Sequence, residues 1–252
     1  GVALTPDGLV MAVAHGGTPY VTTYDWLDGA WVKRPNPAIL PAGYATGVAL
    51  TPDGLVMAVA HGGTPYVTTY DWLDGAWVKR PNPAILPAGD GNGVALTPDG
   101  LVMAVTHNGS PFITTYDWLD GAWVKRPNPA VLPTTYGLVA LTPDGLVMAV
   151  GINAPVGIII YDWLDGAWVK RPNPGSFGGA NNGSGVAVTS DGRIMVAGIS
   201  MYNNLPSTTI TFDTPPAVGA VITADYTVDG VHKTDQYVID VSFAIQFGET
   251  VE

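Results

Sequence analysis

The sequence predicts an all-β protein, a five-bladed β-propeller of four-stranded antiparallel blades with about 46 residues in each blade. The first observation is an internal repeat, because residues 1–43 and 47–89 are identical. The second is the period, since the aspartates of a recurring Pro-Asp-Gly or Ser-Asp-Gly triplet are 46, 46, 45 and 47 residues apart. These aspartates are Asp7, Asp53, Asp99, Asp144 and Asp191. The third is that a single repeat contains four short runs typical of strands.

In the first repeat the expected strands cover residues 2–5, 9–14, 20–26 and 30–34, which are rich in Val, Thr, Tyr and Trp. The turn at residues 5–8 has the sequence Thr-Pro-Asp-Gly. Proline fixes φ near −65° and glycine accepts positive φ, so a tight hairpin is predicted there. The Asp28-Gly29 pair suits a two-residue type I′ turn, which sets Trp26 opposite Trp31.

The polarity of the four strands indicates their radial order. The first is small and apolar, the second is apolar on both faces, and the fourth carries Lys33 and Arg34 before Pro35. A strand that is apolar on both faces fits between neighbouring sheets, whereas charge and proline are tolerated on an outer edge strand. We therefore expect Lys33 and Arg34 on the exposed outermost strand.

The recurrent TPDGLVMAVAH, followed by YVTTYD, resembles WD-repeat-like and YVTN-type β-propeller blades. The resemblance extends over the repeats, which we delimit as 1–46, 47–92, 93–137, 138–184 and 185–214. It implies a propeller architecture but no particular activity, because propellers carry many functions.

The fifth repeat departs most from the others. Its first two strands are expected within residues 185–199, followed by a long loop at 200–206 and a third strand at 208–213. It lacks the DWLDGAWVKRP segment of the other repeats, so residues 220–228 are expected to supply its outer strand. The segment 215–252 would then complete or close the fifth blade.

The stretch AVITADYTVDGVHKTDQYVIDVSFAIQFGE, residues 220–249, resembles the C-terminal ends of tail and other virion proteins of phages and prophages of Gram-positive bacteria. This resemblance implies a virion or extracellular location and other virion proteins as partners. The chain begins inside a repeat, so its N-terminus does not indicate a compartment.

Composition excludes several classes of function. A formal net charge of −11 opposes nucleic acid or an anionic bilayer as the main partner. No apolar run approaches the roughly 18 residues of a spanning helix, so no membrane insertion is expected. The chain has no cysteine, which removes disulfides, thiolate chemistry and Cys-ligated zinc.

Variation between the repeats is concentrated at one end of the expected blades. The second connection reads HGGTP, HGGTP, HNGSP, NAPVG and SMYNNLP in turn, and the segments between blades also differ. These segments would form a recognition face for a sugar or polar polymer, or they simply tolerate drift. The candidate ligand-binding residues are His15, Tyr20, Tyr44, His61, Tyr66, Asp90, Asn92, His107, Asn108, Phe112, Tyr136, Asn153, Tyr202, Asn203 and Asn204.

Two recurring residue sets have alternative readings. The histidines at the ends of the second strands would either form a partial ring on this face or close each loop by hydrogen bonding. A metal site is disfavoured because the fourth repeat has Ile152 there and no acidic residue accompanies each histidine. The Trp pairs would either stack on sugars or clasp the hairpins as cross-strand aromatics do.

The expected function is a non-enzymatic, phage tail-associated binding or structural module that displays the variable face toward a bacterial surface glycan or protein. No nucleophile–base set or opposed carboxylate pair is recognisable, and nearly every aspartate belongs to a repeated turn. No cofactor is expected. The alternatives are a pure protein–protein scaffold and, with less support, a polysaccharide hydrolase.

Overall fold

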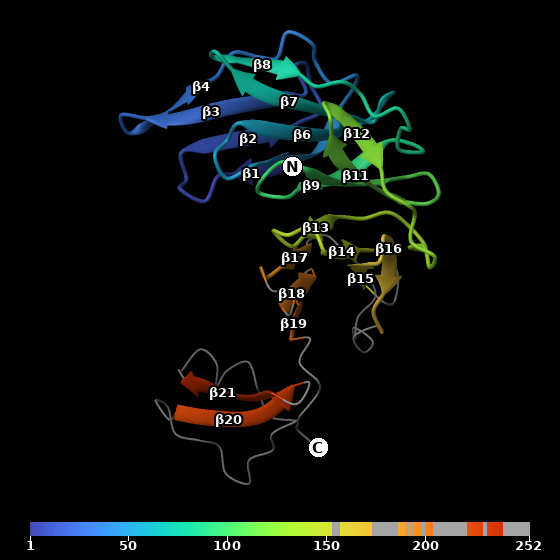
Figure 1. The fold of residues 1–252 in the computed structure, drawn as a ribbon. Helices are drawn as coiled ribbons and strands as arrows, with labels where there is room; N and C mark the ends of the chain where they lie inside the picture. The colour runs from blue at the N-terminus through green and yellow to red at the C-terminus, as the bar shows by residue number, and fades with distance from the viewer. Residues whose placement is uncertain are drawn as a thin grey trace, which may run out of the picture. The chain divides into compact units, whose positions relative to one another are not determined.

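The structure, a computed structural model, describes residues 1–152, 157–172, 186–190, 192, 194–197, 200–203, 221–228 and 231–238. The chain forms two compact units, Gly1–Leu205 and Pro206–Glu252 (Figure 1). All the described regular elements are β-strands. The predicted all-β class is therefore confirmed.

The first four repeats each form one four-stranded antiparallel sheet, which we call a blade. The first blade contains β1 (Val2–Leu4), β2 (Val10–Ala14), β3 (Val21–Leu27) and β4 (Ala30–Lys33). The second contains β5 (Ala45–Leu50), β6 (Val56–His61), β7 (Val67–Leu73) and β8 (Ala76–Lys79). The third contains β9 (Gly91–Leu96), β10 (Val102–His107), β11 (Ile113–Leu119) and β12 (Ala122–Lys125). The fourth contains β13 (Val139–Leu141), β14 (Val147–Gly151), β15 (Ile158–Leu164) and β16 (Ala167–Lys170).

The fifth repeat forms a three-stranded sheet of β17 (Val186–Val188), β18 (Ile194–Ala197) and β19 (Ser200–Asn203). The expected loop is wrong for residues 200–203, which form a strand, and residues 204–206 lie outside the described residues. Ala197 pairs with Ser200 in this sheet. The third strand expected at 208–213 lies outside the described residues.

The second unit contains β20 (Val221–Val228) and β21 (Val231–Val238), which pair along their whole length. Residues 220–228 were expected to form a strand, and β20 confirms this almost to the residue. Its pairing with the fifth repeat stays a prediction.

The first strand of each repeat lies beside the first strand of the next, so that β5 is next to β1 and β9, and β13 is next to β9 and β17. The chain thus has successive antiparallel sheets stacked in a propeller-like arrangement. The apolar second strand of each blade fits the predicted position between neighbours.

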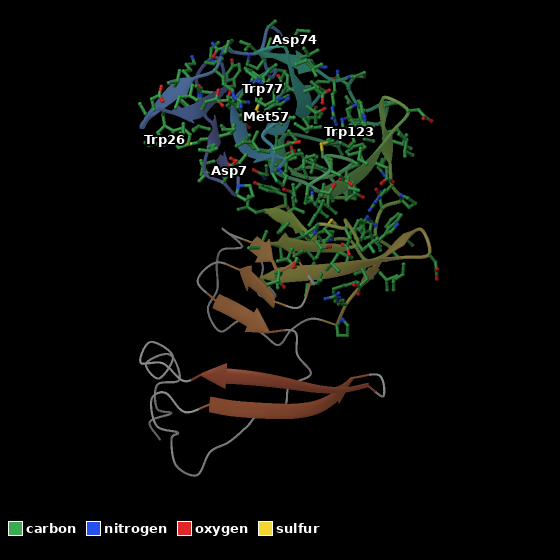
Figure 2. The ribbon with its side chains drawn as sticks, turned by 60° about the vertical axis from the view of Figure 1, so that its left-hand side comes forward. Asp7, Trp26, Met57, Asp74, Trp77 and Trp123 are labelled. Atoms are coloured by element: carbon green, nitrogen blue, oxygen red, sulfur yellow. The ribbon has the colours of Figure 1, made fainter. Side chains whose placement is uncertain are left out.

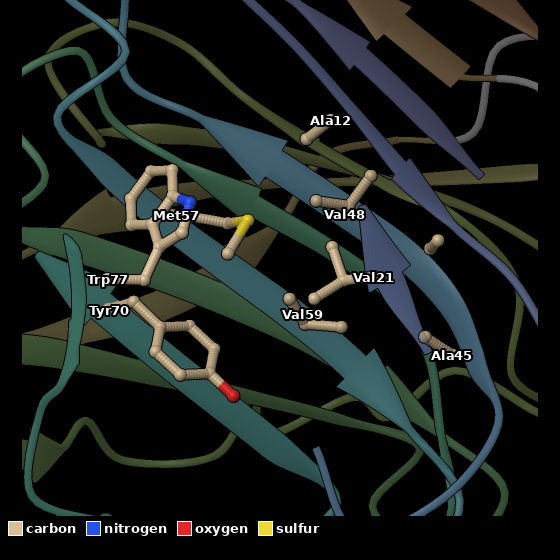
Figure 3. Packing of buried hydrophobic residues seen from close by; sticks show 9 residues of the cluster. Ala12, Val21, Ala45, Val48, Met57, Val59, Tyr70 and Trp77 are labelled. Atoms are coloured by element: carbon tan, nitrogen blue, oxygen red, sulfur yellow. The ribbon is translucent and has the colours of Figure 1, made fainter. Parts of the chain in front are cut away.

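Each blade turns one side toward the preceding blade, which we call its near face, and the other toward the following blade, its far face. Between the first two blades, Ala12 and Val21 of the far face meet Met57, Tyr70 and Trp77 of the near face (Figure 3). Small side chains on one face leave room for large ones on the other. The same division recurs at the next two boundaries, and each fully buried large apolar side chain contributes about 1.5–3 kcal/mol.

The predicted turns are confirmed. In the first repeat, the Thr5 hydroxyl donates to the Asp7 carboxylate at 2.6 Å, and this carboxylate accepts the Leu9 N–H at 3.0 Å. Gly8 has φ of 73°. Asp28 and Gly29 have φ of 49° and 82°, the two positive values that a type I′ turn requires.

Candidate functional site

The segments that link one blade to the next lie at the same end as the second connections within the blades. The Tyr44 carbonyl accepts the Gly62 N–H at 2.9 Å, and the Asp90 carbonyl accepts the Asn108 N–H at 3.1 Å. Tyr44 and Asp90 belong to linkers, whereas Gly62 and Asn108 belong to second connections. We call this end, where the repeats differ, the linker end.

Three candidate residues lie in successive linkers. Tyr44, Asp90 and Tyr136 follow one another at intervals of 46 residues. The Tyr44 hydroxyl donates to Asp90 Oδ2 at 3.3 Å. Tyr44 and Tyr136 are 49% and 42% exposed, so both rings are open to solvent. We call these three residues the linker triad.

A hydrogen bond and the charge of Asp90 connect two members of the triad, Tyr44 and Asp90. The negative charge of Asp90 raises the pKa of Tyr44, and the proximity of Tyr136 raises that pKa further. Both effects oppose loss of the Tyr44 proton. Tyr44 therefore stays a neutral phenol, and its hydroxyl is available as a donor near neutral pH.

Backbone geometry holds the triad in place. The Tyr44 ring covers Gly62 so closely that a Cβ on this glycine would lie 2.5 Å from Cε1 of the ring. The other carboxylate oxygen of Asp90, Oδ1, accepts the Gly63 N–H at 3.1 Å. An exposed aromatic face beside fixed carboxylate and phenol oxygens suits a sugar, because the ring packs on C–H groups while the oxygens bind hydroxyls.

His61 and His107 do not belong to an exposed site, since both side chains are fully buried. The Nε2 atom of each shares a hydrogen bond of 2.8 Å with the Thr68 or Thr114 hydroxyl. Burial lowers the pKa of His61, and lowers the pKa of His107 to about 4. A ligand at the surface therefore does not reach these two imidazoles, and their contacts fit the alternative reading, a histidine that closes its loop by hydrogen bonding.

The fourth repeat supports the structural role of these histidines. Ile152 stands at the histidine position and Ile159 at the threonine position, and both are buried. The polar pair is thus replaced as a unit by an apolar pair. In the first repeat His15 is partly exposed and also shares a hydrogen bond with Thr22, at 2.9 Å.

Tyr20, Tyr66 and Phe112 lie at the end of the second connections and are partly exposed. They have φ of 69°, 70° and 66°, a left-handed conformation that is uncommon for aromatic residues. The sequence carries no signal for this backbone conformation. The three rings therefore lie beside the linker end as expected, but in a strained backbone that the surrounding loop must hold.

The remaining candidates are asparagines and one tyrosine. Asn108 is exposed at the linker end, and Asn92 is partly exposed in β9. Tyr202 and Asn203 lie in β19, and their side chains are not among the described atoms. Asn153 and Asn204 lie outside the described residues.

The Trp pairs clasp the hairpins and also join the blades. In all four repeats the two indoles meet edge to face, with ring centroids 5.0–5.2 Å apart. The second indole of the pair is buried in blades two to four, at Trp77, Trp123 and Trp168. These three indoles are not available as platforms for a sugar.

Arg34 is not a surface residue, which corrects the sequence-based expectation. Its side chain is only 7% exposed, pairs with Asp25 at 2.7 Å and lies 4.3 Å above the Trp72 ring of the next blade. Arg80 and Arg126 repeat these contacts. The recurrence of Lys-Arg-Pro beside the Trp pair in four repeats is the signal that points to this role.

Within the described part of the chain, no group of three or more His, Asp or Glu residues is placed to hold a metal ion. A search of the same residues finds no helix long and apolar enough to cross a membrane.

No protein family model matches the chain, and no curated protein matches it. Among solved structures, the hydrazine synthase of Kuenenia stuttgartiensis is similar, with a TM-score of 0.56 and 19% sequence identity. The match covers 95% of this chain and 65% of that chain, so this chain spans less than two thirds of its length. At this identity the likeness concerns the fold alone. The fold and its contacts thus define a repeat protein of propeller-like β-sheets.

Proposed function

We propose that this protein is a non-enzymatic binding module that presents its linker end to a glycan or protein of a bacterial surface. The observation that carries the proposal is the linker triad. Tyr44, Asp90 and Tyr136 come from three different linkers, Tyr44 and Asp90 share a hydrogen bond, and the rings of Tyr44 and Tyr136 are exposed. Residues in successive linkers can bind successive parts of an extended polymer.

A glycan is the favoured ligand because of the residue types in the triad. Exposed tyrosines combine apolar contact area with a polar tip, and the Asp90 carboxylate accepts hydrogen bonds from hydroxyl groups. The net charge of −11 disfavours a strongly anionic polymer. We therefore expect neutral or cationic saccharides to bind in preference to acidic ones.

The resemblance of residues 220–249 to the ends of phage tail proteins supports a place in a virion. The binding module would then be a component of a tail that contacts other virion proteins as well as the host surface. Detection of the protein in purified virions by mass spectrometry tests this part of the proposal.

For the architecture, we extend the four observed blades to five, with residues 220–228 as the outer strand of the fifth. The sheet of β17, β18 and β19 supports this, because the described residues give it three strands where the other blades have four. Deletion of residues 215–252 should then leave an unpaired edge and cause dimerisation or aggregation. A deletion variant that stays monomeric with unchanged melting would contradict this scheme.

The binding proposal is tested on a glycan array and on host cells. Tyr44→Ala and Tyr136→Ala should each weaken binding about ten-fold or more, since loss of a stacked ring removes both apolar contact and a hydrogen bond. Leu73→Ala is the matched control, because Leu73 is an exposed apolar residue in the opposite-end hairpin. Equal binding by all three variants would contradict a site at the linker end.

Two other outcomes would change the assignment of function. Binding to purified virion proteins together with no signal for any glycan would favour a scaffold. Release of reducing sugars from host cell walls would show that the protein is a hydrolase instead.

A further inference from the structure

The near face of the first blade is exposed, although the same residues are buried in the other three four-stranded blades. Val2 is 67% exposed, whereas its counterpart Val48 is 8% exposed. Trp31 is 38% exposed, whereas its counterpart Trp77 is 3% exposed. In Figure 2, Trp26 lies at the edge of the first sheet, whereas Met57 and Trp77 of the second blade lie among other side chains. The first blade therefore presents an apolar interface with nothing described against it.

The second, third and fourth blades show what a near face binds. Each receives the far face of the preceding blade, which supplies small apolar side chains, one threonine hydroxyl and one arginine. The threonine accepts the indole N–H of the second Trp at 2.8–2.9 Å, in the pairs Thr23–Trp77, Thr69–Trp123 and Thr115–Trp168. These hydrogen bonds satisfy indole groups that the blade contact buries.

The arginine makes two contacts with the next blade. It lies over the first Trp ring at 4.3–4.5 Å, in the pairs Arg34–Trp72, Arg80–Trp118 and Arg126–Trp163. It also donates to a carbonyl of the Pro-Asp-Gly turn at 3.1–3.2 Å, at Gly54, Gly100 and Gly145. One arginine thus binds both the hairpin and the turn of the blade that follows it.

The first blade retains every group that these contacts use. Residues 1–43 are identical to residues 47–89, so Trp26, Trp31 and Gly8 stand where Trp72, Trp77 and Gly54 stand in the second blade. The two Trp rings of the first blade already have the edge-to-face arrangement, with a centroid distance of 5.2 Å. The interface is therefore preformed.

We propose that the near face of the first blade is a docking site for one further blade of this same repeat type. The occupant must carry a threonine on its third strand and an arginine after its fourth. This inference rests on the packing between blades and is independent of the proposed binding function.

Neither the fifth repeat nor a second copy of the chain fits this face as well. The fifth repeat has no Lys-Arg-Pro segment and so offers no equivalent arginine. The arginines of the first three repeats already bind the following blade, and Arg171 of the fourth donates to the Gly192 carbonyl at 3.0 Å. Each of these four arginines therefore already binds a turn of the blade that follows it.

The docked blade would also extend the linker end. Its linker would contact Gly16 in the way that the Tyr44 carbonyl accepts the N–H of Gly62, the counterpart of Gly16. A residue equivalent to Tyr44 would then precede the linker triad.

The test exploits the absence of cysteine from the chain. Val2→Cys places a single thiol on the exposed near face, and Val48→Cys places one at the buried equivalent position. A second version of Val2→Cys carries an additional copy of residues 1–46 before Gly1, joined as residue 46 is joined to residue 47. We measure the rate at which a maleimide labels each folded protein.

In the chain without the extension, Val2→Cys should react at least about ten-fold faster than Val48→Cys. The extension should slow the labelling of Val2→Cys by at least about ten-fold. As a control, the arginine of the added repeat, the counterpart of Arg34, is replaced by leucine. This replacement should restore much of the fast labelling, because the docked blade loses the contacts that this arginine makes. Slow labelling caused only by crowding from the attached segment would not depend on the arginine.

Two results would overturn the proposal. Labelling that stays fast in the extended chain would show that a further repeat does not dock. Slow labelling of Val2→Cys in the chain without the extension would show that the face is already covered, by the fifth repeat if sedimentation reports a monomer and by a second copy if it reports a dimer.

Discussion

The indole nitrogen of Trp77 donates a hydrogen bond of 2.8 Å to the hydroxyl of Thr23, which lies 54 residues earlier in the chain and in the preceding blade. Both groups are buried. The fourth blade has Ile160 at the threonine position, and the fifth repeat that follows it contains no Trp. Where the following repeat has no Trp to donate the hydrogen bond, the preceding blade has no threonine to accept it. This indicates that the Thr–Trp pair serves the contact between blades.

Replacement of this threonine by valine should therefore be costly. Thr23→Val leaves the buried indole N–H of Trp77 without its acceptor, and the free energy of unfolding should fall by about 1–3 kcal/mol. Thr23→Ser keeps the hydroxyl and should cost less. Urea denaturation of both variants measures the difference, and equal losses would show that the hydrogen bond contributes nothing.

Replacement of Arg80 even by lysine should destabilise the protein. Its guanidinium binds Asp71 at 2.7 Å, donates to the Gly100 carbonyl and lies 4.4 Å above the Trp118 ring. Lysine reproduces the charge but neither the fork of donors nor the planar stacking, so Arg80→Lys should lower the free energy of unfolding by about 2 kcal/mol.

Arg171→Lys is the matched control for Arg80→Lys. Arg171 keeps the bond to Asp162 at 2.6 Å, but the fifth repeat supplies no indole beneath it. Arg171→Lys should therefore lower the free energy of unfolding less than Arg80→Lys does. The difference should equal the cation–π contribution, about 0.5–2 kcal/mol. Equal losses at the two positions, measured by chemical denaturation, would contradict a role for the stacking.

Two equivalent glycines should respond differently to alanine. Gly8 and Gly54 have φ of 73° and 67°, so Ala at either position should cost about 1 kcal/mol from the backbone alone. A Cβ on Gly54 would lie 2.8 Å from Cγ2 of Val10 in the preceding blade, whereas a Cβ on Gly8 meets nothing within 4 Å. Calorimetry should therefore show a larger drop in melting temperature for Gly54→Ala.

A drop of the same size for Gly8→Ala and Gly54→Ala would argue against tight packing of the second turn on the first blade.

The interaction of Asp90 with Tyr44 predicts a change in an observable pKa. The carboxylate charge of Asp90 is the main cause that raises the Tyr44 pKa, so Asp90→Asn should lower this pKa toward its ordinary value. Titration of ¹³C-labelled tyrosine by NMR, with Tyr44→Phe for assignment, measures the shift. Asp74→Asn serves as the control, because Asp74 lies in a hairpin turn with φ of 49°, which asparagine tolerates. An unchanged Tyr44 pKa in Asp90→Asn would mean that the triad does not form.

The protein should become less stable as the pH is lowered through the range in which buried His107 stays unprotonated. Burial lowers its pKa from 6.5 to about 4, so between these values the unfolded chain binds a proton that the folded chain does not. The free energy of unfolding therefore decreases as pH falls from about 6.5 to about 4, by about 3 kcal/mol from this residue. Urea denaturation at a series of pH values measures the decrease.

The fourth repeat suggests the control for His107. The double variant His107→Ile, Thr114→Ile introduces the apolar pair found at Ile152 and Ile159, which leaves no buried hydroxyl without a partner. Its stability should depend less on pH over the same range. A pH profile that matches the unmodified protein would show that His107 is not the group responsible.

Much of the fold could be predicted because the repeat shows the same local pattern several times. The turns at Asp7 and Asp28 depend on residues adjacent in sequence, and they form as expected. The strand β19 was missed, because the fifth repeat departs from the pattern that identifies its strands. The linker end was correctly placed by the topology of an antiparallel sheet, in which alternate connections emerge at the same end.

The candidate site was predicted less well. Sequence reasoning selected Tyr44, Asp90 and Tyr136 among fifteen candidates, but it could not show that they interact, since they are separated by 46 residues. It also placed His61 and His107 on the exposed face and Arg34 on the surface, and all three are buried. For Arg34 the contacts that bury it include the Trp72 ring of the next repeat, 46 residues further along the pattern than its own Trp26.

The sequence by itself determined the repeat, the strands and the turns, because these depend on side chains close together along the chain. Only the tertiary structure decided which side chains are buried. Residues 1–43 and 47–89 are identical, yet Trp31 is exposed and Trp77 is buried. Burial depends on what lies across the interface, and only the second of these identical blades has a described blade before it.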